Sequence, residues 1–148
     1  MANALIDTNV LVYAYDRGEH AKQRQAIALL EGLQLANSGR LSTQVLAEFF
    51  TAATHGPKPI LSVTQAGDEV EALASGWPIL LVTEPIVKAA TRAVRDRRLN
   101  YWDAQLWATA LLNQVPLIFS EDLAGGSTLE GVRIVNPFAS GFRLSDWQ

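Results

Sequence analysis

The sequence predicts an α/β protein: a three-layer α/β/α sandwich built around a mainly parallel sheet. Short apolar runs alternate along the chain with segments whose apolar residues recur at helical spacing. The runs are solidly apolar, as in Ile79-Leu80-Leu81-Val82, and this is typical of strands that helices cover on both faces. Since the chain has 148 residues and contains neither a repeat nor a linker, we expect residues 1–148 to form one domain.

The elements of the N-terminal half follow from apolar spacing and from residues that start or stop helices. Asp7 or Thr8 can cap a first helix, Ser42 or Thr43 a later one, and Ser62 another. The expected stops are Asn37-Ser38-Gly39 and His55-Gly56-Pro57. The expected elements are a strand at 4–6, a helix over about 8–15, a helix at 19–36 with Ala26, Ile27, Leu30 and Leu33 inward and Lys22 outward, an extended piece at 40–41, a helix over about 43–54, and a helix at 62–76 with Val63, Val70 and Leu73 on one side.

The C-terminal half continues the alternation. Thr83-Glu84-Pro85 is a helix start, with a cap, an acid and a proline in the first positions, and Asn100 can cap the next helix. We expect a strand at 78–82, a helix from 83 that carries several arginines, a helix at 101–113, a strand at 117–119, a loop at Gly125-Gly126-Ser127 and a last strand at 132–135.

Composition excludes several classes of protein. The chain has no cysteine, which rules out disulfides, a thiol nucleophile and cysteine-ligated zinc or iron–sulfur sites. No apolar run approaches the ~20 residues that a membrane span needs. Asp7 comes too early for a signal peptide, and no basic region precedes it. We therefore expect a cytoplasmic protein without a membrane partner.

Four acids are candidates for one site. Asp7 and Asp122 each follow an apolar strand, and functional groups of open parallel sheets gather at the carboxyl ends of strands. Glu48 interrupts an apolar helix, and Asp103 lies in the first turn of another. Taken singly, these residues could be a helix cap, a turn residue, a salt-bridged glutamate and an acid favoured by the helix dipole. Carboxylates that share a site repel each other unless a cation lies between them, and hard ions such as Mg²⁺ or Mn²⁺ prefer oxygen ligands.

Four motifs in order carry a resemblance to a known family. They are Leu5-Ile6-Asp7-Thr8-Asn9-Val10-Leu11, Ser42-Thr43-Gln44-Val45-Leu46-Ala47-Glu48-Phe49, Tyr101-Trp102-Asp103-Ala104 and Ser120-Glu121-Asp122-Leu123. With them the sequence resembles PIN-domain proteins, and among these the VapC-type toxins of bacterial toxin–antitoxin pairs, as far as Asn136-Pro137-Phe138. The resemblance implies that Asp7, Glu48, Asp103 and Asp122 line a pocket for Mg²⁺ or Mn²⁺, and that Thr8, Asn9 and Ser120 support them.

The same resemblance implies an activity and partners. It implies a metal-dependent endoribonuclease that hydrolyses RNA phosphodiester bonds, forms a homodimer and is bound by a cognate antitoxin. A bound ion can activate water and neutralise the phosphate without a histidine, so the mechanism requires neither His20 nor His55.

The charge distribution leaves room for an RNA substrate. The net charge is −3, but it becomes +1 when the four candidate acids are assigned to a metal site. Five of the 12 basic residues lie between Lys88 and Arg98. These basic side chains either form a solvated helix face or bind RNA phosphates, and we favour RNA contacts by Arg92, Arg95 and Arg98. Trp102, next to Asp103, is a further candidate for an RNA contact.

Three alternatives remain at this stage. A receiver-type signalling domain would normally have a lysine after its last strand, and no lysine follows Lys88. A haloacid-dehalogenase-like phosphatase would have Asp-x-Asp after the first strand, but position 9 is Asn9. A non-catalytic PIN-like RNA-binding module would tolerate loss of the acids, and all four are present.

Overall fold

The strands join into one sheet in the order β3-β2-β1-β4-β6-β5. The computed structural model describes residues 2–123 and 127–147, so Gly125 and Gly126 of the expected loop lie outside the described residues. The elements are β1 (Ala4–Ile6), α1 (Thr8–Tyr13), α2 (His20–Leu35), β2 (Gly39–Ser42), α3 (Thr43–Thr54), α4 (Val63–Gly76), β3 (Ile79–Leu80), α5 (Glu84–Arg97), α6 (Tyr101–Leu112), β4 (Leu117–Phe119), β5 (Thr128–Leu129), β6 (Val132–Val135) and a 3₁₀ turn, η1 (Leu144–Trp147).

The sheet is parallel from β3 to β6, which confirms the predicted fold class. The two-residue strand β5 was not predicted, and it pairs antiparallel with β6. The turn between them holds Glu130 at φ 48° and Gly131 at φ 85°. Two successive residues with positive φ are typical of a tight hairpin, so this local turn adds an antiparallel edge to the sheet.

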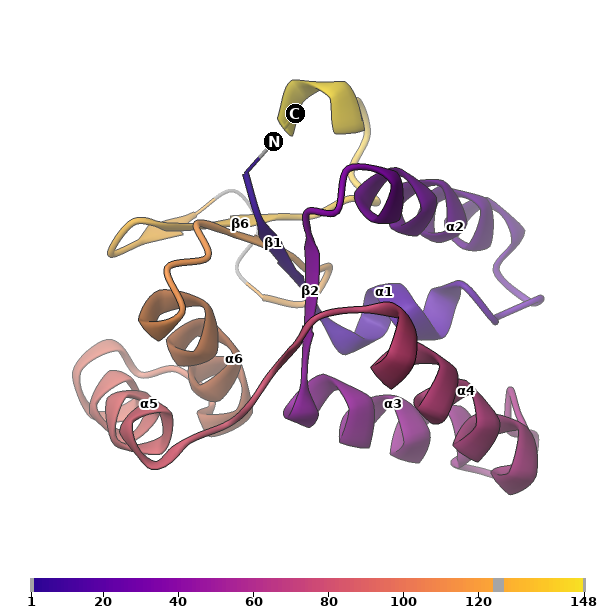
Figure 1. The fold of residues 1–148 in the computed structure, drawn as a ribbon, viewed down its shortest axis with the longest axis horizontal. Helices are drawn as coiled ribbons and strands as arrows, with labels where there is room; N and C mark the ends of the chain where they lie inside the picture. Colours follow the sequence, from indigo (N-terminus) through magenta and orange to yellow (C-terminus); the bar gives the residue numbers. More distant parts are fainter. Residues whose placement is uncertain (1, 124–126, 148) are drawn as a thin grey trace.

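Helices cover both sides of the sheet. Figure 1 shows α1, α2, α3 and α4 on one side of β1 and β2, and α5 and α6 paired on the other. The three residues of β1 are fully buried between these layers, as are Phe49 of α3 and Phe119 of β4. This explains why β1 and β4 are solidly apolar, because both of their faces meet side chains rather than water.

Side-chain caps start the helices that carry site residues. The Ser42 hydroxyl accepts from the backbone N–H of Val45 (3.2 Å) at the start of α3, and Asn100 Oδ1 accepts from that of Trp102 (2.9 Å) at the start of α6. Ser62 and Gln65 form a reciprocal capping box on α4. Each cap satisfies a backbone donor that has no partner within its own helix. The capping residues therefore allowed these helix starts to be predicted from the sequence.

The expected strand at 78–82 is wrong in extent. Only Ile79 and Leu80 are in β3, and Leu81 is 63% exposed. The strand lies at the sheet edge and pairs with β2 alone, so the apolar run expected to be a strand over 78–82 has only two residues in the sheet.

Three other expectations about helices are corrected. Val63 is 66% exposed because it is the first residue of α4. Ile27 of α2 is 39% exposed, and Leu29 faces the core in its place. At the end of α2 the left-handed residue is Asn37 (φ 51°), whereas Gly39 already belongs to β2.

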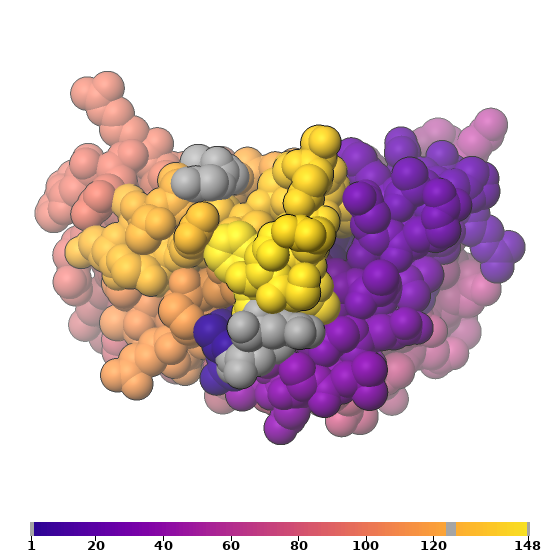
Figure 2. Space-filling view, turned by 90° about the horizontal axis from the view of Figure 1, so that it is seen from above, coloured from indigo at the N-terminus to yellow at the C-terminus, as the bar shows by residue number. Residues whose placement is uncertain are grey.

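The C-terminal segment packs across one face of the molecule. Figure 2 shows it in yellow between the purple surface of α2 and the orange region of β4 and β6. The Arg133 guanidinium of β6 lies 4.6 Å from the centre of the Trp147 ring, and Leu144 contacts α2 at Gly32. Among the described helices, none has the length and apolar character needed to cross a membrane.

Gly39 marks a tight approach between β2 and the end of α4. A Cβ atom there would overlap the ring of Trp77, whereas one on Gly67, inside α4, would have no neighbour within 4 Å. We expect Gly39→Ala to lower the free energy of unfolding by about 1–3 kcal/mol through overpacking. Gly67→Ala is the matched control and should raise it by about 0.5–1 kcal/mol. Urea denaturation measures both changes; equal effects would contradict the tight packing.

Candidate active site

Asp7 leaves the end of β1 beside the end of β4. The two strands pair in parallel with Ile6 opposite Phe119, and the backbone N–H of Asp7 donates to the Phe119 carbonyl at 3.0 Å. This bond extends the pairing one residue beyond the strand. The next residue after β4, Ser120, donates its hydroxyl to Asp7 Oδ2 at 2.6 Å. Strand pairing therefore sets the position of the first candidate acid.

Asn9 joins the carboxylates of Asp7 and Asp122. Its Nδ2 donates to Asp7 Oδ2 at 3.3 Å and to Asp122 Oδ2 at 3.1 Å, across 113 residues of sequence in the second case. Its Oδ1 accepts from the backbone N–H of Glu121 at 3.3 Å. One neutral amide thus holds two acids at the same edge of the sheet.

Ser120 organises the turn that carries Asp122. The side chain is fully buried, and its hydroxyl accepts from the backbone N–H groups of Asp122 (3.2 Å) and Leu123 (3.1 Å) while donating to Asp7. Because the single hydroxyl serves all three bonds, the turn after β4 has a defined place relative to Asp7.

Thr8 contacts Asp7 through its backbone rather than its side chain. The Thr8 N–H donates to Asp7 Oδ1 at 2.7 Å. Its buried hydroxyl has no hydrogen-bond partner, the one such side-chain atom in residues 2–123 and 127–147. Buried polar atoms are normally paired, so this hydroxyl marks a place beside Asp7 where a further polar group would be satisfied.

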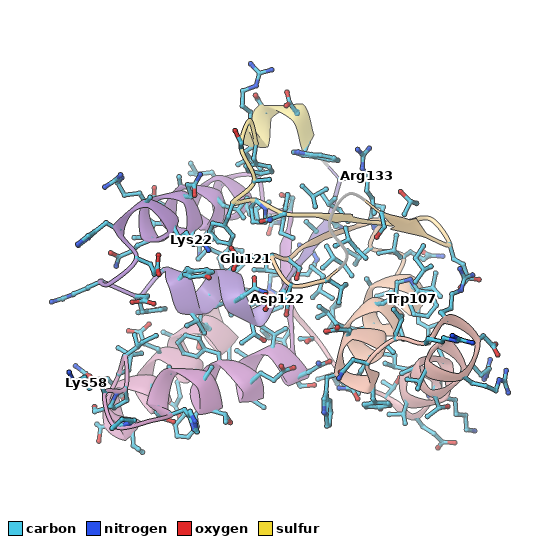
Figure 3. All side chains as sticks on the ribbon, turned by 180° about the vertical axis from the view of Figure 1, so that it is seen from behind. Lys22, Lys58, Trp107, Glu121, Asp122 and Arg133 are labelled. Atoms are coloured by element: carbon cyan, nitrogen blue, oxygen red, sulfur yellow. The ribbon has the colours of Figure 1, made fainter. Side chains whose placement is uncertain are left out.

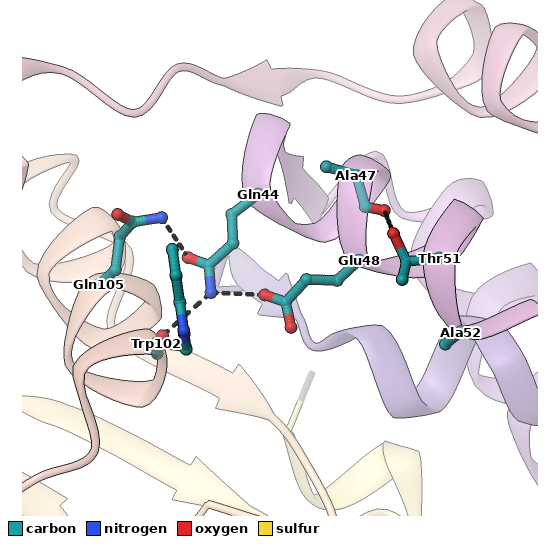
Figure 4. A pocket seen from close by; sticks show the side chains of 7 residues that line it. All are labelled: Gln44, Ala47, Glu48, Thr51, Ala52, Trp102 and Gln105. Carbon is teal, nitrogen blue, oxygen red and sulfur yellow. Dashed lines mark hydrogen bonds between the residues drawn. The ribbon is translucent and has the colours of Figure 1, made fainter. Parts of the chain in front are cut away.

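Glu48 approaches the site from α3. Its Oε1 accepts from Gln44 Nε2 at 2.6 Å. Figure 4 shows both side chains in a pocket of about 480 Å³ between α3 and α6. The lining residues are Gln44, Ala47, Glu48, Thr51, Ala52, Trp102 and Gln105. Trp102 is 58% exposed and also lines this pocket.

Mutual repulsion and burial link the acids. Burial raises the pKa of Asp7 to about 6; Ser120 and Thr8 oppose this through hydrogen bonds, while the charges of Glu48 and Asp103 add to it. Asp103, half-buried in the first turn of α6, also has a raised pKa, first through burial and then through the charge of Asp122. Asp7, Glu48, Asp103 and Asp122 therefore share one region of negative potential.

The donor set fits a hard divalent cation in its chemistry. All four acids offer oxygen, and none forms an ion pair with a basic residue in the part of the chain that the structure describes. The described histidines and acids contain no group of three or more already close enough to hold a metal ion. Neutral amides and hydroxyls, rather than basic side chains, separate the carboxylates in this arrangement.

The predicted RNA-binding residues do not all gather at the pocket. Trp102 lines it, but Arg92, Arg95 and Arg98 are exposed on or next to α5 and none of them lines it. Arg95 is held by Asp96 through bonds of 2.6 and 3.0 Å. The arginine cluster is therefore a separate surface of the molecule.

Glu121 turns away from the carboxylates toward α1 and α2. Tyr13 donates to its Oε1 and Lys22 to its Oε2, each at 2.7 Å, and Figure 3 shows Lys22 beside Glu121 with Asp122 next to it. Burial acts to raise the pKa of Glu121, but these bonds hold it below the usual value. Lys22, expected to face outward, is thus a half-buried partner of Glu121.

Sequence reasoning missed Gln44 and Gln105. Both are buried polar side chains of the pocket, and Gln105 Nε2 donates to Gln44 Oε1 at 2.9 Å. Gln44 lies four residues before Glu48, a spacing that places the two side chains on one helix face. That spacing was a usable signal, whereas nothing local pointed to Gln105.

The chain is similar to a known protein family over most of its length. The model of the PIN domain matches residues 4–124, from the first residue of β1 to just beyond Asp122. The chain belongs to the PIN domain family. This confirms the resemblance seen in the sequence, and it sets aside the receiver-type and dehalogenase-like interpretations.

Solved structures with this PIN fold include several from toxin–antitoxin complexes. A chain of a toxin–antitoxin complex from Klebsiella pneumoniae has a TM-score of 0.67 at 20% identity, with 92% of this chain and 98% of that chain covered. VapC20 of Mycobacterium tuberculosis, a Sarcin-Ricin loop cleaving toxin, has a TM-score of 0.64 at 18% identity, covering 86% and 98%. A chain of DNA-bound VapBC from Salmonella typhimurium has a TM-score of 0.64 at 19% identity, with 93% of this chain and 99% of that chain covered.

A search of curated proteins gave no significant match. At identities of 18–20% the structural neighbours show that the PIN fold is shared, and the chemistry has to be argued from the residues of this chain.

The raised pKa of Asp7 predicts a gain in stability when its charge is removed. Because the native pKa is about 6 and the ordinary value is 3.8, ionised Asp7 destabilises the PIN domain fully above pH 6 and not at all below pH 3.8. In chelator at pH 7, Asp7→Asn should raise the free energy of unfolding by about 2–3 kcal/mol.

Thermal and urea unfolding across pH 4–8 measure this effect. The gain should shrink as the pH falls toward 4. Asp96→Asn is the matched control, because Asp96 is exposed and its pKa is lowered by Arg95, so it should give no such gain. A pH-independent difference for Asp7→Asn would contradict the burial of a charge.

Proposed function

We propose that this PIN-domain protein is a metal-dependent endoribonuclease that hydrolyses RNA phosphodiester bonds and acts as the toxin of a toxin–antitoxin pair. One observation supports the proposal above the others: four acids from two strand ends and two helices share one region of negative potential without a basic partner among the described residues. Such an arrangement costs stability unless a cation offsets the repulsion.

Asp7, Glu48, Asp103 and Asp122 are the residues that would hold Mg²⁺ or Mn²⁺. A divalent ion bound there would lower the pKa of a water molecule and neutralise charge on the phosphate. The unpaired hydroxyl of Thr8 and the oxygen-only donor set are compatible with a hydrated hard ion.

The remaining residues of the site orient these acids. Asn9 holds Asp7 and Asp122 together, and Ser120 fixes both Asp7 and the turn that follows β4. Lys22 and Tyr13 draw Glu121 to the other side. Of the two neighbouring acids in this turn, Asp122 is therefore the one that faces the site.

RNA would contact two surfaces. The exposed ring of Trp102 at the pocket offers a face on which a base can stack beside the acids. Arg92 and Arg98 are exposed and can bind phosphates away from the pocket, whereas Arg95 would first have to leave Asp96. The separation of these surfaces favours an RNA longer than a dinucleotide.

If the protein is a toxin of this kind, it has binding partners. The similar structures come from complexes described as toxin–antitoxin or VapBC assemblies, and VapC20 is described as a toxin that cleaves the Sarcin-Ricin loop. By analogy with these proteins we propose a cognate antitoxin for this chain. The motif resemblance leads us to propose in addition a homodimer and a cytoplasmic site of action.

Cleavage of total cellular RNA tests the proposal directly. Purified protein with Mg²⁺ or Mn²⁺ should give discrete fragments, and chelator should abolish them. Asp7→Asn should lower the rate by more than about 100-fold, because even the outer partners of metal ligands contribute about 10–100-fold. Glu31→Gln, an exposed acid on α2, should leave the rate unchanged.

The outcomes separate the candidate functions. Discrete products that depend on metal and on Asp7 support the nuclease. Binding of RNA without cleavage by antitoxin-free, metal-loaded protein would instead favour the non-catalytic RNA-binding module.

The pH dependence of metal binding follows from Asp7. Protonation of an acid whose pKa is about 6 competes with a cation for the same oxygens, so affinity should fall as the pH drops below 6. Titration of Mn²⁺ at pH 5 and pH 7.5 should show weaker binding at pH 5. Equal affinities at the two values would argue against Asp7 as a ligand.

A further inference from the structure

A relay of hydrogen bonds runs from α6 to the carboxylate of Glu48. The Tyr101 hydroxyl donates to Gln105 Oε1 at 2.8 Å, Gln105 Nε2 donates to Gln44 Oε1 at 2.9 Å, and Gln44 Nε2 donates to Glu48 Oε1 at 2.6 Å. The part of this relay inside the pocket is drawn in Figure 4. It connects two helices that are 61 residues apart in sequence at the Gln44–Gln105 bond.

The hydrogen-bond partners determine which way the amide groups of Gln44 and Gln105 are oriented. Gln44 Nε2 also donates to the backbone carbonyl of Trp102 at 3.0 Å, and a carbonyl oxygen can only accept. The nitrogen of the amide must therefore face Trp102 and Glu48, and its oxygen must face Gln105. Gln105 consequently presents its own nitrogen to Gln44 and its oxygen to Tyr101.

We propose that Gln44, held by Gln105 and by the Trp102 carbonyl, is a positioning residue that presents Glu48 to the metal ion. The inference rests on the proposed nuclease function and deepens it. It assigns a role to two glutamines that neither the strand-end pattern nor the family match assigns.

A neutral donor suits this role better than a basic residue. A lysine or arginine beside Glu48 would hold the carboxylate but neutralise the charge that attracts a cation. The amide of Gln44 fixes one carboxylate oxygen and leaves the full negative charge in place. The other oxygen, Oε2, has no hydrogen-bond partner among residues 2–123 and 127–147, so it is free to bind an ion.

The relay also sets Glu48 relative to Asp103. The carbonyl that receives the second bond from Gln44 belongs to Trp102, the residue directly before Asp103. One amide therefore touches the acid of α3 and the backbone next to the acid of α6. Gln44 and Gln105 are only 9% and 7% exposed, so a broken bond would leave a buried polar group unpaired, which makes alternative arrangements costly.

Binding of Mn²⁺, followed through the signal of the free ion in electron paramagnetic resonance, tests the inference without using activity. The variants are Gln44→Leu, which removes the donor, and Gln105→Leu, which removes only its support. Gln25→Leu, an exposed glutamine of α2, is the matched control. Thermal unfolding in chelator establishes that each variant is folded.

Gln44→Leu should weaken Mn²⁺ binding by about 10–100-fold, the range observed for outer partners of metal ligands. Gln105→Leu should give a smaller loss, because Glu48 and the Trp102 carbonyl still accept from Gln44. Gln25→Leu should bind as the wild type does. The graded order is the signature of positioning, since simple destabilisation would follow the unfolding temperatures instead.

The outcomes distinguish this inference from the proposed function. Wild-type affinity in a folded Gln44→Leu variant would overturn the inference while the nuclease proposal stands. Absence of Mn²⁺ binding by the wild type would contradict the proposed function. Nuclear magnetic resonance of the metal-free protein would then test the hydrogen bond between Gln44 and Glu48. In that measurement, the side-chain amide resonances of Gln44 should shift in Glu48→Ala; unchanged resonances would overturn the inference.

Discussion

The bond from the Asp7 N–H to the Phe119 carbonyl is the constraint on which the rest of the site depends. It continues the parallel pairing of β1 and β4 past the end of β1, so Asp7 and Ser120 emerge side by side from a buried sheet. The contacts at the strand ends build on this pair: Ser120 holds the turn of Asp122, and Asn9 bridges the two acids. Several hydrogen bonds therefore tie Asp7 and Asp122 to the buried sheet.

The second feature is the use of neutral donors around concentrated negative charge. Amides and hydroxyls contact Asp7, Glu48 and Asp122, while the nearby lysine, Lys22, pairs with Glu121 on the far side of the turn. The local structure thus preserves repulsion that basic residues would remove. Burial and repulsion together raise the pKa of Asp7, so the domain gives up stability to keep an anionic site. This balance is consistent with the cation site proposed above.

Much of the fold was predictable because its signals are local. The caps Ser62 and Asn100, the solidly apolar run at 117–119 and the acids that end strands each depend on neighbours within a few residues. The expectations that failed depend on position in the sheet. The run at 78–82 has the composition of a central strand, but it lies at an edge with one partner, so its apolar residues are partly exposed.

The sequence by itself determined the fold class and the family, and it predicted that four acids form one site. Tertiary structure decided how those acids are held: the Asn9 bridge spans 113 residues, the Gln44–Gln105 bond spans 61, and Lys22 turns inward to Glu121. The reason is physical. Strand and helix signals act through backbone neighbours, whereas a side-chain contact between α3 and α6 exists only after both helices have packed against the sheet from opposite sides.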